Sequence, residues 1–159
     1  MTASKRLDTL FPTLAEIPEA YRPDAPIEQR EYLVDGQLRA SGDITGLKPD
    51  SEHGFHIHEK GDCSSGDGMS TGGHFNPGGK SHGHHGMGDH HTGDLPSLKA
   101  DANGVASFSF ESRTIRVGST ANDIVGKGLI VHRDPDDYKT QPTGNAGPRL
   151  ACAVIAAKS

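Results

Sequence analysis

Short runs of alternating hydrophobic and polar residues, separated by long polar stretches, fill the chain from about residue 31 onwards. They predict strands at 31–34, 37–45, 53–59, 104–111, 126–132 and 150–157. Asp35-Gly36 between the first two runs predicts a hairpin turn. Long helical patterns are hard to find in this region. The pattern therefore favours an all-β domain over a helical bundle or an α/β sheet.

Two kinds of segment interrupt this pattern. Residues 1–30 have a partly helical pattern, but they also contain four prolines that would cut a helix short. Residues 60–97 and 133–148 are predicted loops, and the first consists largely of Gly, His, Asp and Ser. A loop of that length inside a single domain is usually functional or disordered.

The composition narrows the class of protein. The 159 residues suffice for one domain with a core, and 21 glycines, 10 prolines and a hydrophobic content of 32% agree with a loop-rich β-fold. A net charge of -5 argues against nucleic-acid binding. No apolar run approaches the ~20 residues that span a bilayer, so no membrane partner is expected. The start of the chain lacks the apolar core of a signal peptide, so either the protein stays where it is made or the sequence begins after processing.

The ten histidines all lie within residues 53–132. Strand alternation places His56 and His58 on one face, and His132 ends a buried apolar run from which it can converge on that pair. Imidazole is a donor for both zinc and copper. A set made of these three histidines and one histidine from the long loop suits tetragonal copper(II).

The long loop supplies a second set of donors. His74, His82 and His91 lie in it, and Asp94 follows the last of them by three residues. Histidines completed by one carboxylate suit tetrahedral zinc at a closed structural site. The alternative for this loop is a His-rich tract that only scavenges metal.

Cys63 and Cys152 are far apart in the sequence. They are either two reduced, buried thiols or a disulfide. A disulfide would close a loop of about 90 residues and remove ~4.5 kcal/mol of unfolded-state entropy.

Four segments resemble the signature segments of the copper,zinc superoxide dismutases, in the same order and at similar spacing. They are His53-Gly-Phe-His-Ile-His-Glu59, Gly73-His-Phe-Asn-Pro77, His91-Thr-Gly-Asp-Leu95 and Gly144-Asn-Ala-Gly-Pro-Arg-Leu-Ala-Cys152. Residues 59–63 and 134–139 resemble the bacterial, periplasmic branch. The resemblance covers about residues 41–155. It implies a Greek-key β-barrel or sandwich.

The resemblance also implies a role for each residue of the site. Copper would be held by His56, His58, His74 and His132. Zinc would be held by His74, His82, His91 and Asp94, so that His74 bridges the two metals. Asp136 would link a copper ligand to a zinc ligand, Arg149 would guide the anionic substrate, and Cys63 and Cys152 would form a disulfide.

The implied activity is the disproportionation of superoxide to dioxygen and hydrogen peroxide by copper cycling between copper(II) and copper(I), with Arg149 and His74 as catalytic residues and a structural zinc. The alternative is a copper- and zinc-binding protein without turnover, such as a buffer or a chaperone-like relic. The implied location is the periplasm. The oligomeric state stays open, with a homodimer as the candidate.

The N-terminal part departs from the family pattern. Residues 1–39 resemble the N-terminus of an aldehyde dehydrogenase, so the chain is read as a chimera joined near residues 39–42. We expect an atypical N-terminal segment at 1–36 in place of the family's first strands, followed by the dismutase-like domain at 37–159. Loss of two strands would expose sheet edges and lower the stability of the barrel.

Overall fold

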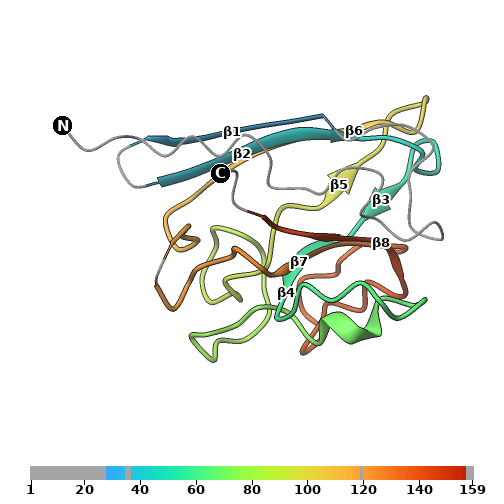
Figure 1. Ribbon diagram of the computed structural model, residues 1–159. Coiled ribbons are helices and arrows are strands. Elements are labelled where there is room, and N and C mark those ends of the chain that lie inside the picture. Colours follow the sequence, from blue (N-terminus) through green and yellow to red (C-terminus); the bar gives the residue numbers. More distant parts are fainter. Residues whose placement is uncertain (1–27, 35–36, 119, 157–159) are drawn as a thin grey trace.

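The computed structural model describes residues 28–34, 37–118 and 120–156, and the regular structure in them is nearly all β-sheet (Figure 1). The strands are β1 (Glu28–Val34), β2 (Gln37–Ile44), β3 (Glu52–His53), β4 (Phe55–His58), β5 (Leu98–Lys99), β6 (Ala106–Ser112), β7 (Gly128–His132) and β8 (Arg149–Val154). Within these residues the one helical element is a 3-10 turn, η3 (Met69–Thr71). The all-β prediction is therefore confirmed. No helix in the described part of the chain is long and apolar enough to cross a membrane.

The strands form two antiparallel three-stranded sheets, β1-β2-β6 and β4-β7-β8, with β3 and β5 as a short third pair. Val34 pairs with Gln37, so the predicted hairpin between β1 and β2 is confirmed, although residues 35–36 themselves lie outside the described residues. The chain leaves β2 for the other sheet and returns to it at β6. Such a crossover is what a Greek-key arrangement requires.

The core lies between the two larger sheets, which Figure 1 shows one above the other. Leu38 and Ile44 of β2 meet Phe55 and Ile57 of β4 in one cluster of buried side chains. The rings of Phe55 and Phe108 are 5.2 Å apart, in a tilted contact that joins β4 to β6. Phe55 and Ile57 of β4 therefore face the core. Because side chains alternate along a strand, His56 and His58 face the opposite side, towards the loops.

The run predicted as one strand at 53–59 is two strands, because the backbone changes partner at Gly54. Gly54 donates its N–H to the carbonyl of Asp134 and accepts one from His132. A Cβ at this position would lie 2.7 Å from the Cβ of Ala146, so only glycine fits. The loop after β7 is thereby attached at the start of the histidine-bearing strand.

The long loop is attached to the free edge of β4. Phe75 and Leu95 donate backbone N–H groups to the carbonyls of Ile57 and Phe55, and Ile57 donates to the carbonyl of Gly93. A Cβ on Gly93 would lie 2.2 Å from the carbonyl oxygen of Ile57, so this close approach requires glycine. The loop is therefore held at residue 75 and at residues 93–95 against the strand that carries His56 and His58.

Two predictions about the N-terminal part stay predictions. Among the described residues β1 pairs only with β2, and β8 only with β7. Residues 1–27 lie outside them, so the expected shortage of strands is not tested. The boundary expected between residues 36 and 37 also stays a prediction.

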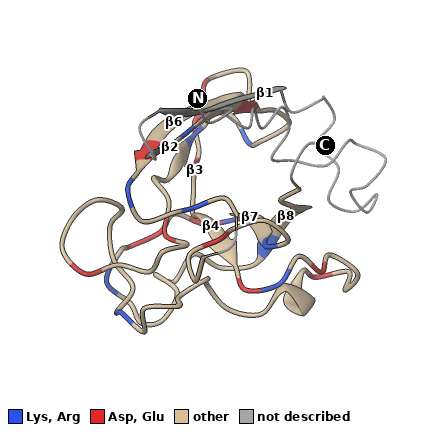
Figure 2. Cartoon of the chain, turned by 60° about the vertical axis from the view of Figure 1, so that its left-hand side comes forward, with Lys and Arg blue, Asp and Glu red and all other residues tan. Residues whose placement is uncertain are grey.

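Charged residues of both signs are interspersed over the described strands and loops rather than gathered on one face (Figure 2). Arg39 and Glu111, which are cross-strand partners on β2 and β6, form an exposed ion pair of 2.7 Å. Exposed pairs of this kind contribute about 0.2–1 kcal/mol. Surface charge is therefore a minor contributor to this fold.

Candidate metal centre

Four buried histidines form what we call the strand cluster: His56, His58, His74 and His132. His56 and His58 lie on β4, and His132 ends the neighbouring strand β7. His74 comes from the long loop, where it forms an isolated bridge with His58. One nitrogen of each ring lies within 4.8 Å of the others. The predicted convergence of strand and loop histidines is present.

Backbone carbonyls orient two rings of the strand cluster. The Nδ1–H of His58 donates to the carbonyl of Gly72 (2.9 Å), and that of His132 donates to the carbonyl of Gly147 (3.0 Å). Both Nε2 atoms therefore carry lone pairs, and they face each other at 3.4 Å. A hydrogen bond at the far nitrogen is the usual way in which a protein fixes the tautomer of a metal-binding histidine.

A second group, which we call the loop cluster, consists of His74, His82, His91 and Asp94, all buried. The Nδ1 atoms of the three histidines lie 2.9, 3.0 and 3.5 Å from Oδ1 of Asp94. The other carboxylate oxygen, Oδ2, accepts the backbone N–H groups of His91 and Gly83. The carboxylate is thereby held in place, and Oδ1 is left to the three imidazoles.

His74 belongs to both clusters. Its Nδ1 contacts Asp94 of the loop cluster, and its Nε2 is buried without a hydrogen-bond partner. Its ring stacks on that of His56, with the centroids 3.9 Å apart. One ring therefore offers a nitrogen to each cluster, as a bridging ligand must.

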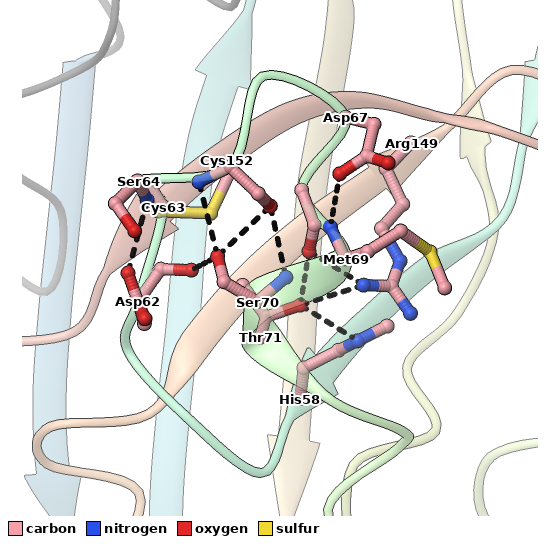
Figure 3. The surroundings of a disulfide bond; sticks show 12 residues. His58, Asp62, Cys63, Ser64, Asp67, Met69, Ser70, Thr71, Arg149 and Cys152 are labelled. Carbon is pink, nitrogen blue, oxygen red and sulfur yellow. Dashed lines mark hydrogen bonds between the residues drawn. A yellow bond between two sulfur atoms is a disulfide. The ribbon is translucent and has the colours of Figure 1, made fainter.

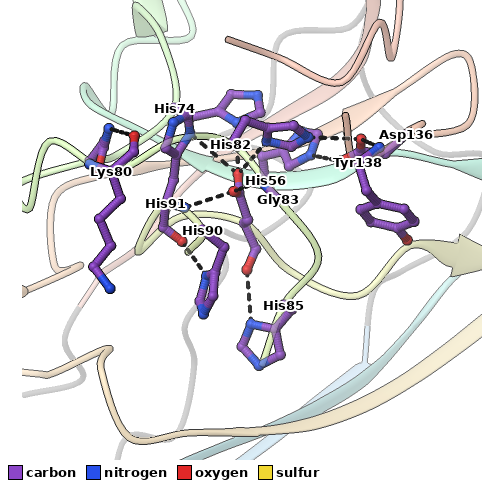
Figure 4. Close-up of polar contacts among 12 residues, drawn as sticks. His56, His74, Lys80, His82, Gly83, His85, His90, His91, Asp136 and Tyr138 are labelled. Carbon is purple, nitrogen blue, oxygen red and sulfur yellow. Dashed lines mark hydrogen bonds and ion pairs between the residues drawn. The ribbon is translucent and has the colours of Figure 1, made fainter. Parts of the chain in front are cut away.

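Asp136 connects the clusters a second time, from behind the ligands (Figure 4). Its Oδ2 lies 2.7 Å from Nε2 of His56, and its Oδ1 lies 2.9 Å from Nε2 of His82. The backbone N–H of Tyr138 also donates to Oδ1 (2.7 Å). Gly144 makes room for this carboxylate, since a Cβ there would lie 1.8 Å from Oδ1.

Arg149 lies beside the strand cluster, where residues 63–72 hold it (Figure 3). We call this segment the disulfide loop because it begins at Cys63. Its guanidinium donates to the carbonyls of Gly68 (2.5 Å) and Gly72 (2.7 Å) and to Oγ1 of Thr71 (3.0 Å). The Cys63–Cys152 disulfide ties this loop to β8, which confirms the oxidised alternative. The guanidinium is therefore fixed near His58, which donates to the same Gly72 carbonyl.

The electrostatics keep the strand histidines neutral. Burial lowers the pKa of His56 to about 3, that of His58 to about 2 and that of His132 to about 4. A neutral imidazole keeps the lone pair that a metal needs. Around neutral pH these rings are therefore ready to bind a cation without first losing a proton.

The two carboxylates stay charged for the opposite reason. Burial acts to raise the pKa of Asp94 and of Asp136, but hydrogen bonds from the histidines outweigh it and hold both pKa values below their usual range. Burial likewise acts to lower the pKa of His82, yet its contacts with Asp136 and Asp94 raise it to about 9. Without a metal, His82 therefore carries a proton around neutral pH.

The donor sets fit copper and zinc. Three buried side-chain nitrogens lack a hydrogen-bond partner, namely Nδ1 of His56, Nε2 of His74 and Nδ1 of His91, and each belongs to one of the clusters. A buried nitrogen without a partner is costly, and binding a metal ion is one way in which a protein satisfies it. Four imidazoles suit copper, and three imidazoles with one carboxylate suit zinc.

All the ligands named from the sequence fall into one of the two clusters, whereas three other histidines of the loop do not. Each of these three, His84, His85 and His90, has its Nδ1 within 2.9 Å of a backbone carbonyl. Sequence reasoning missed Thr71 and Gly144, which contact Arg149 and Asp136. Thr71 contacts a residue far away in the sequence, so its local sequence shows no role. Gly144 lies in the same predicted loop as Asp136 and begins a signature segment, but no sequence pattern shows that this carboxylate approaches it.

Comparison with known proteins shows the family that this chain matches. Residues 26–155 match the sequence model of the copper/zinc superoxide dismutases. A curated relative, the superoxide dismutase [Cu-Zn] of Paramecium bursaria Chlorella virus 1, is 43% identical over 140 residues, which cover 83% of this chain and 74% of the relative.

Solved structures also match this chain over most of its length. The clock protein EA4 is 35% identical, with a TM-score of 0.80 over 99% of this chain and 98% of its own. A SOD-like protein from Bacillus subtilis is 32% identical, with a TM-score of 0.75 over 87% of this chain and 96% of its own. A double mutant of a SOD-like protein from the same organism is 38% identical, with a TM-score of 0.72 over 82% and 88% of the two chains.

Proposed function

The chain belongs to the copper/zinc superoxide dismutase family, and from that premise we propose that the two clusters are the halves of one dismutase site. His56, His58, His74 and His132 hold copper. His74, His82, His91 and Asp94 hold zinc. The single observation that carries this assignment is His74, one buried ring with a nitrogen in each cluster.

The protein is a superoxide dismutase. When bound, copper supplies the one-electron chemistry, alternating between copper(II) and copper(I) as two superoxide ions become dioxygen and hydrogen peroxide. The chain has to supply the rest: a rigid set of ligands, a path for a small anion, and a proton at the right atom. Each of these tasks falls to residues described above.

His74 is the residue that we propose moves the proton. Burial lowers its pKa, so its ring is neutral before it meets a metal. With Nδ1 held beside Asp94 on the loop-cluster side, Nε2 can take up or release one proton without moving the ring. Because peroxide carries two protons that superoxide lacks, a buried nitrogen that exchanges a proton is useful in this position.

Arg149 is the residue that we propose guides the substrate. Its guanidinium lies beside the strand cluster, fixed by acceptors on the disulfide loop. A fixed cation raises the local concentration of a small anion and speeds its arrival. We expect Arg149→Ala to keep both metals, to slow turnover and to flatten its salt dependence. An unchanged rate and salt profile would contradict this role.

Metal analysis combined with an assay of superoxide disproportionation tests the assignment as a whole. One copper and one zinc per chain, with activity that a chelator removes, is the expected result. Stoichiometric metal without turnover would instead indicate the runner-up, a copper- and zinc-binding protein that does not catalyse. A His74→Ala variant that still binds both metals independently would contradict the shared ligand.

We also propose a cellular location for the protein. We propose a periplasmic enzyme of the bacterial type, on the basis of the Glu59–Cys63 and Asp134–Lys139 segments and a disulfide, which suits an oxidising compartment. Fractionation of the native host tests this, and recovery in the cytosol would contradict it.

We propose a homodimer as the assembly of this protein. Sedimentation velocity tests that, and a monomer at micromolar concentration would contradict it.

The resemblance of residues 1–39 to an aldehyde dehydrogenase N-terminus supports our proposal of a chimera. The family match begins at residue 26, so residues 26–39 fall within both assignments. A chain that starts at residue 26 tests the proposal. If the preceding residues come from another fold, metal content and melting temperature are expected to stay unchanged, and a large loss of stability would contradict it.

A further inference from the structure

Thr71 is a fully buried residue whose hydroxyl lies between two parts of the site (Figure 3). On one side, Nη1 of Arg149 lies 3.0 Å from its Oγ1. On the other, Nδ1 of the copper ligand His58 lies 3.1 Å from the same oxygen. A hydroxyl in this position is more than a space filler, because a methyl group there would leave both neighbours with one contact fewer.

The direction of each hydrogen bond follows from the chemistry of the groups. A guanidinium has donors only, so Oγ1 accepts from Arg149. The hydroxyl hydrogen of Thr71 donates to the carbonyl of Gly68, at 2.9 Å. The remaining lone pair faces the Nδ1–H of His58, which the carbonyl of Gly72 shares at 2.9 Å. The Oγ1 atom of Thr71 thus joins Arg149, the proposed guide for the anion, to the proposed copper ligand His58.

The hydroxyl is held in place independently of Arg149. The backbone N–H of Thr71 donates to Gly68, and its carbonyl accepts from Lys60. Its methyl group packs over Gly128 of β7, where an added Cβ would lie only 3.2 Å from it. A β-branched side chain with its methyl packed in this way has little freedom at χ1. The position of Oγ1 is therefore set by the backbone and by packing.

We propose that Thr71 is a positioning residue that sets the direction of the Arg149 guanidinium relative to His58, and thereby the affinity of the site for small anions. This rests on the proposed function, in which Arg149 guides superoxide. The two backbone acceptors of Arg149 lie on the same loop as Thr71 and move with it. The hydroxyl ties the guanidinium to a ligand on β4 at the Nη1 side, as the Gly72 carbonyl does at the Nη2 side, so its loss loosens the orientation of the cation relative to the metal site.

Three variants test the proposal. Thr71→Val keeps the shape and removes the hydroxyl, and Thr71→Ser restores it. Thr45→Val is the matched control, because the Oγ1 of Thr45 is buried without a partner in the described structure. With azide as the probe anion, we expect Thr71→Val to weaken binding to the copper(II) form about 3–10-fold, the range typical of the net contribution of one hydrogen bond.

The same variant should lower kcat/KM by a similar factor at low salt and reduce its salt dependence. We expect Thr71→Ser to recover both quantities to within about twofold. Thr45→Val should leave both unchanged. A Thr71→Val protein that is merely less stable, with wild-type azide affinity and salt dependence, would overturn the proposal.

A second readout needs no metal. In the metal-free protein, the Nη1–H groups of Arg149 should exchange with solvent faster in Thr71→Val than in wild type or Thr45→Val, as measured by NMR of the guanidinium. This measurement decides the matter even for a variant that loads less copper. Equal exchange in all three proteins would overturn the proposal.

Arg149→Ala separates the two levels of inference. Wild-type azide affinity in Arg149→Ala would overturn the guiding role itself. Weakened binding in Arg149→Ala together with wild-type binding in Thr71→Val would leave the guide in place and overturn only the role of Thr71.

Discussion

The two clusters differ in what holds their ligands. In the strand cluster, His56, His58 and His132 lie on hydrogen-bonded neighbours β4 and β7, and the residues that alternate with the β4 histidines are buried in the core. In the loop cluster, His82 and His91 come from a segment whose buried contacts are mostly polar and centre on Asp94. Apolar burial thus sets one half of the site, and a carboxylate sets the other.

The difference has a thermodynamic meaning. Ordering a residue of loop costs about 1–2 kcal/mol in backbone entropy, and a segment with few apolar side chains has little burial to offset that cost. Metal binding then supplies folding free energy directly. The strand cluster should exist before metal arrives, whereas the loop cluster should be completed by it.

Removal of both metals should produce the largest difference between the two clusters. We expect backbone amides within residues 78–92 to exchange at least about a hundredfold faster in the metal-free protein, because local opening of the loop no longer costs the zinc-binding energy. Amides of β4 and β7 should change far less. Hydrogen exchange measured by mass spectrometry checks this. Zinc alone should restore the loop, and equal deprotection of both regions would contradict the distinction.

Loss of charge at the centre of the loop cluster should be the next largest effect. Asp94→Asn removes the one carboxylate that three imidazoles share. We expect zinc affinity to fall about a hundredfold or more, and copper affinity less than tenfold, since of the four proposed copper ligands His74 alone contacts Asp94 through its side chain. Competition with a chromophoric chelator measures both constants. A parallel loss for the two metals would show that the clusters are not separable.

A change at Asp136 should affect both clusters, because its carboxylate contacts one ligand of each. Asp136→Asn keeps the shape but cannot accept from both His56 and His82. We expect both metals to bind about 10–100-fold more weakly, the usual cost of losing a carboxylate behind a metal-bound histidine. Asp134→Asn is the matched control, since its carboxylate pairs with the exposed Arg133. An effect on one metal only would contradict the bridging role.

The two clusters should also respond oppositely to pH in the metal-free protein. His56, His58 and His132 have lowered pKa values, so the unfolded chain binds more protons and stability falls as the pH drops below about 6.5. His82 has a pKa raised to about 9, so its contribution is complete below 6.5 and is lost between 6.5 and 9. Stability should therefore peak near pH 6.5, and urea titrations at several pH values check this. His82→Gln should remove the alkaline decline alone.

The strand cluster was largely predictable from the sequence. Alternation in residues 55–58 fixes which side of β4 the histidines occupy, and this is a local property of an extended chain. The loop donors His74, His82, His91 and Asp94 were grouped by residue type and by the spacing of the last two, and the resemblance to the family then assigned each to its metal, since no local periodicity relates them.

Contacts that depend on how the loops fold could not be predicted in the same way. Thr71 reaches Arg149 because segments far apart in the sequence fold against each other, and Gly144 makes room for Asp136 because the loop at 133–148 folds back on itself. The short pair β3 and β5 was missed for a related reason. Two residues on each side are too few to show a period, and their pairing depends on where the long loop ends.

The disulfide also imposes an order of events during biosynthesis. Cys152 follows the last metal ligand in the chain by twenty residues, and it must pair with a residue 89 positions earlier. A ribosome has therefore released every histidine of the site before the loop around Arg149 can be closed. Metal capture can precede oxidation, so final maturation of the anion path can be controlled separately, by whichever compartment supplies the oxidant.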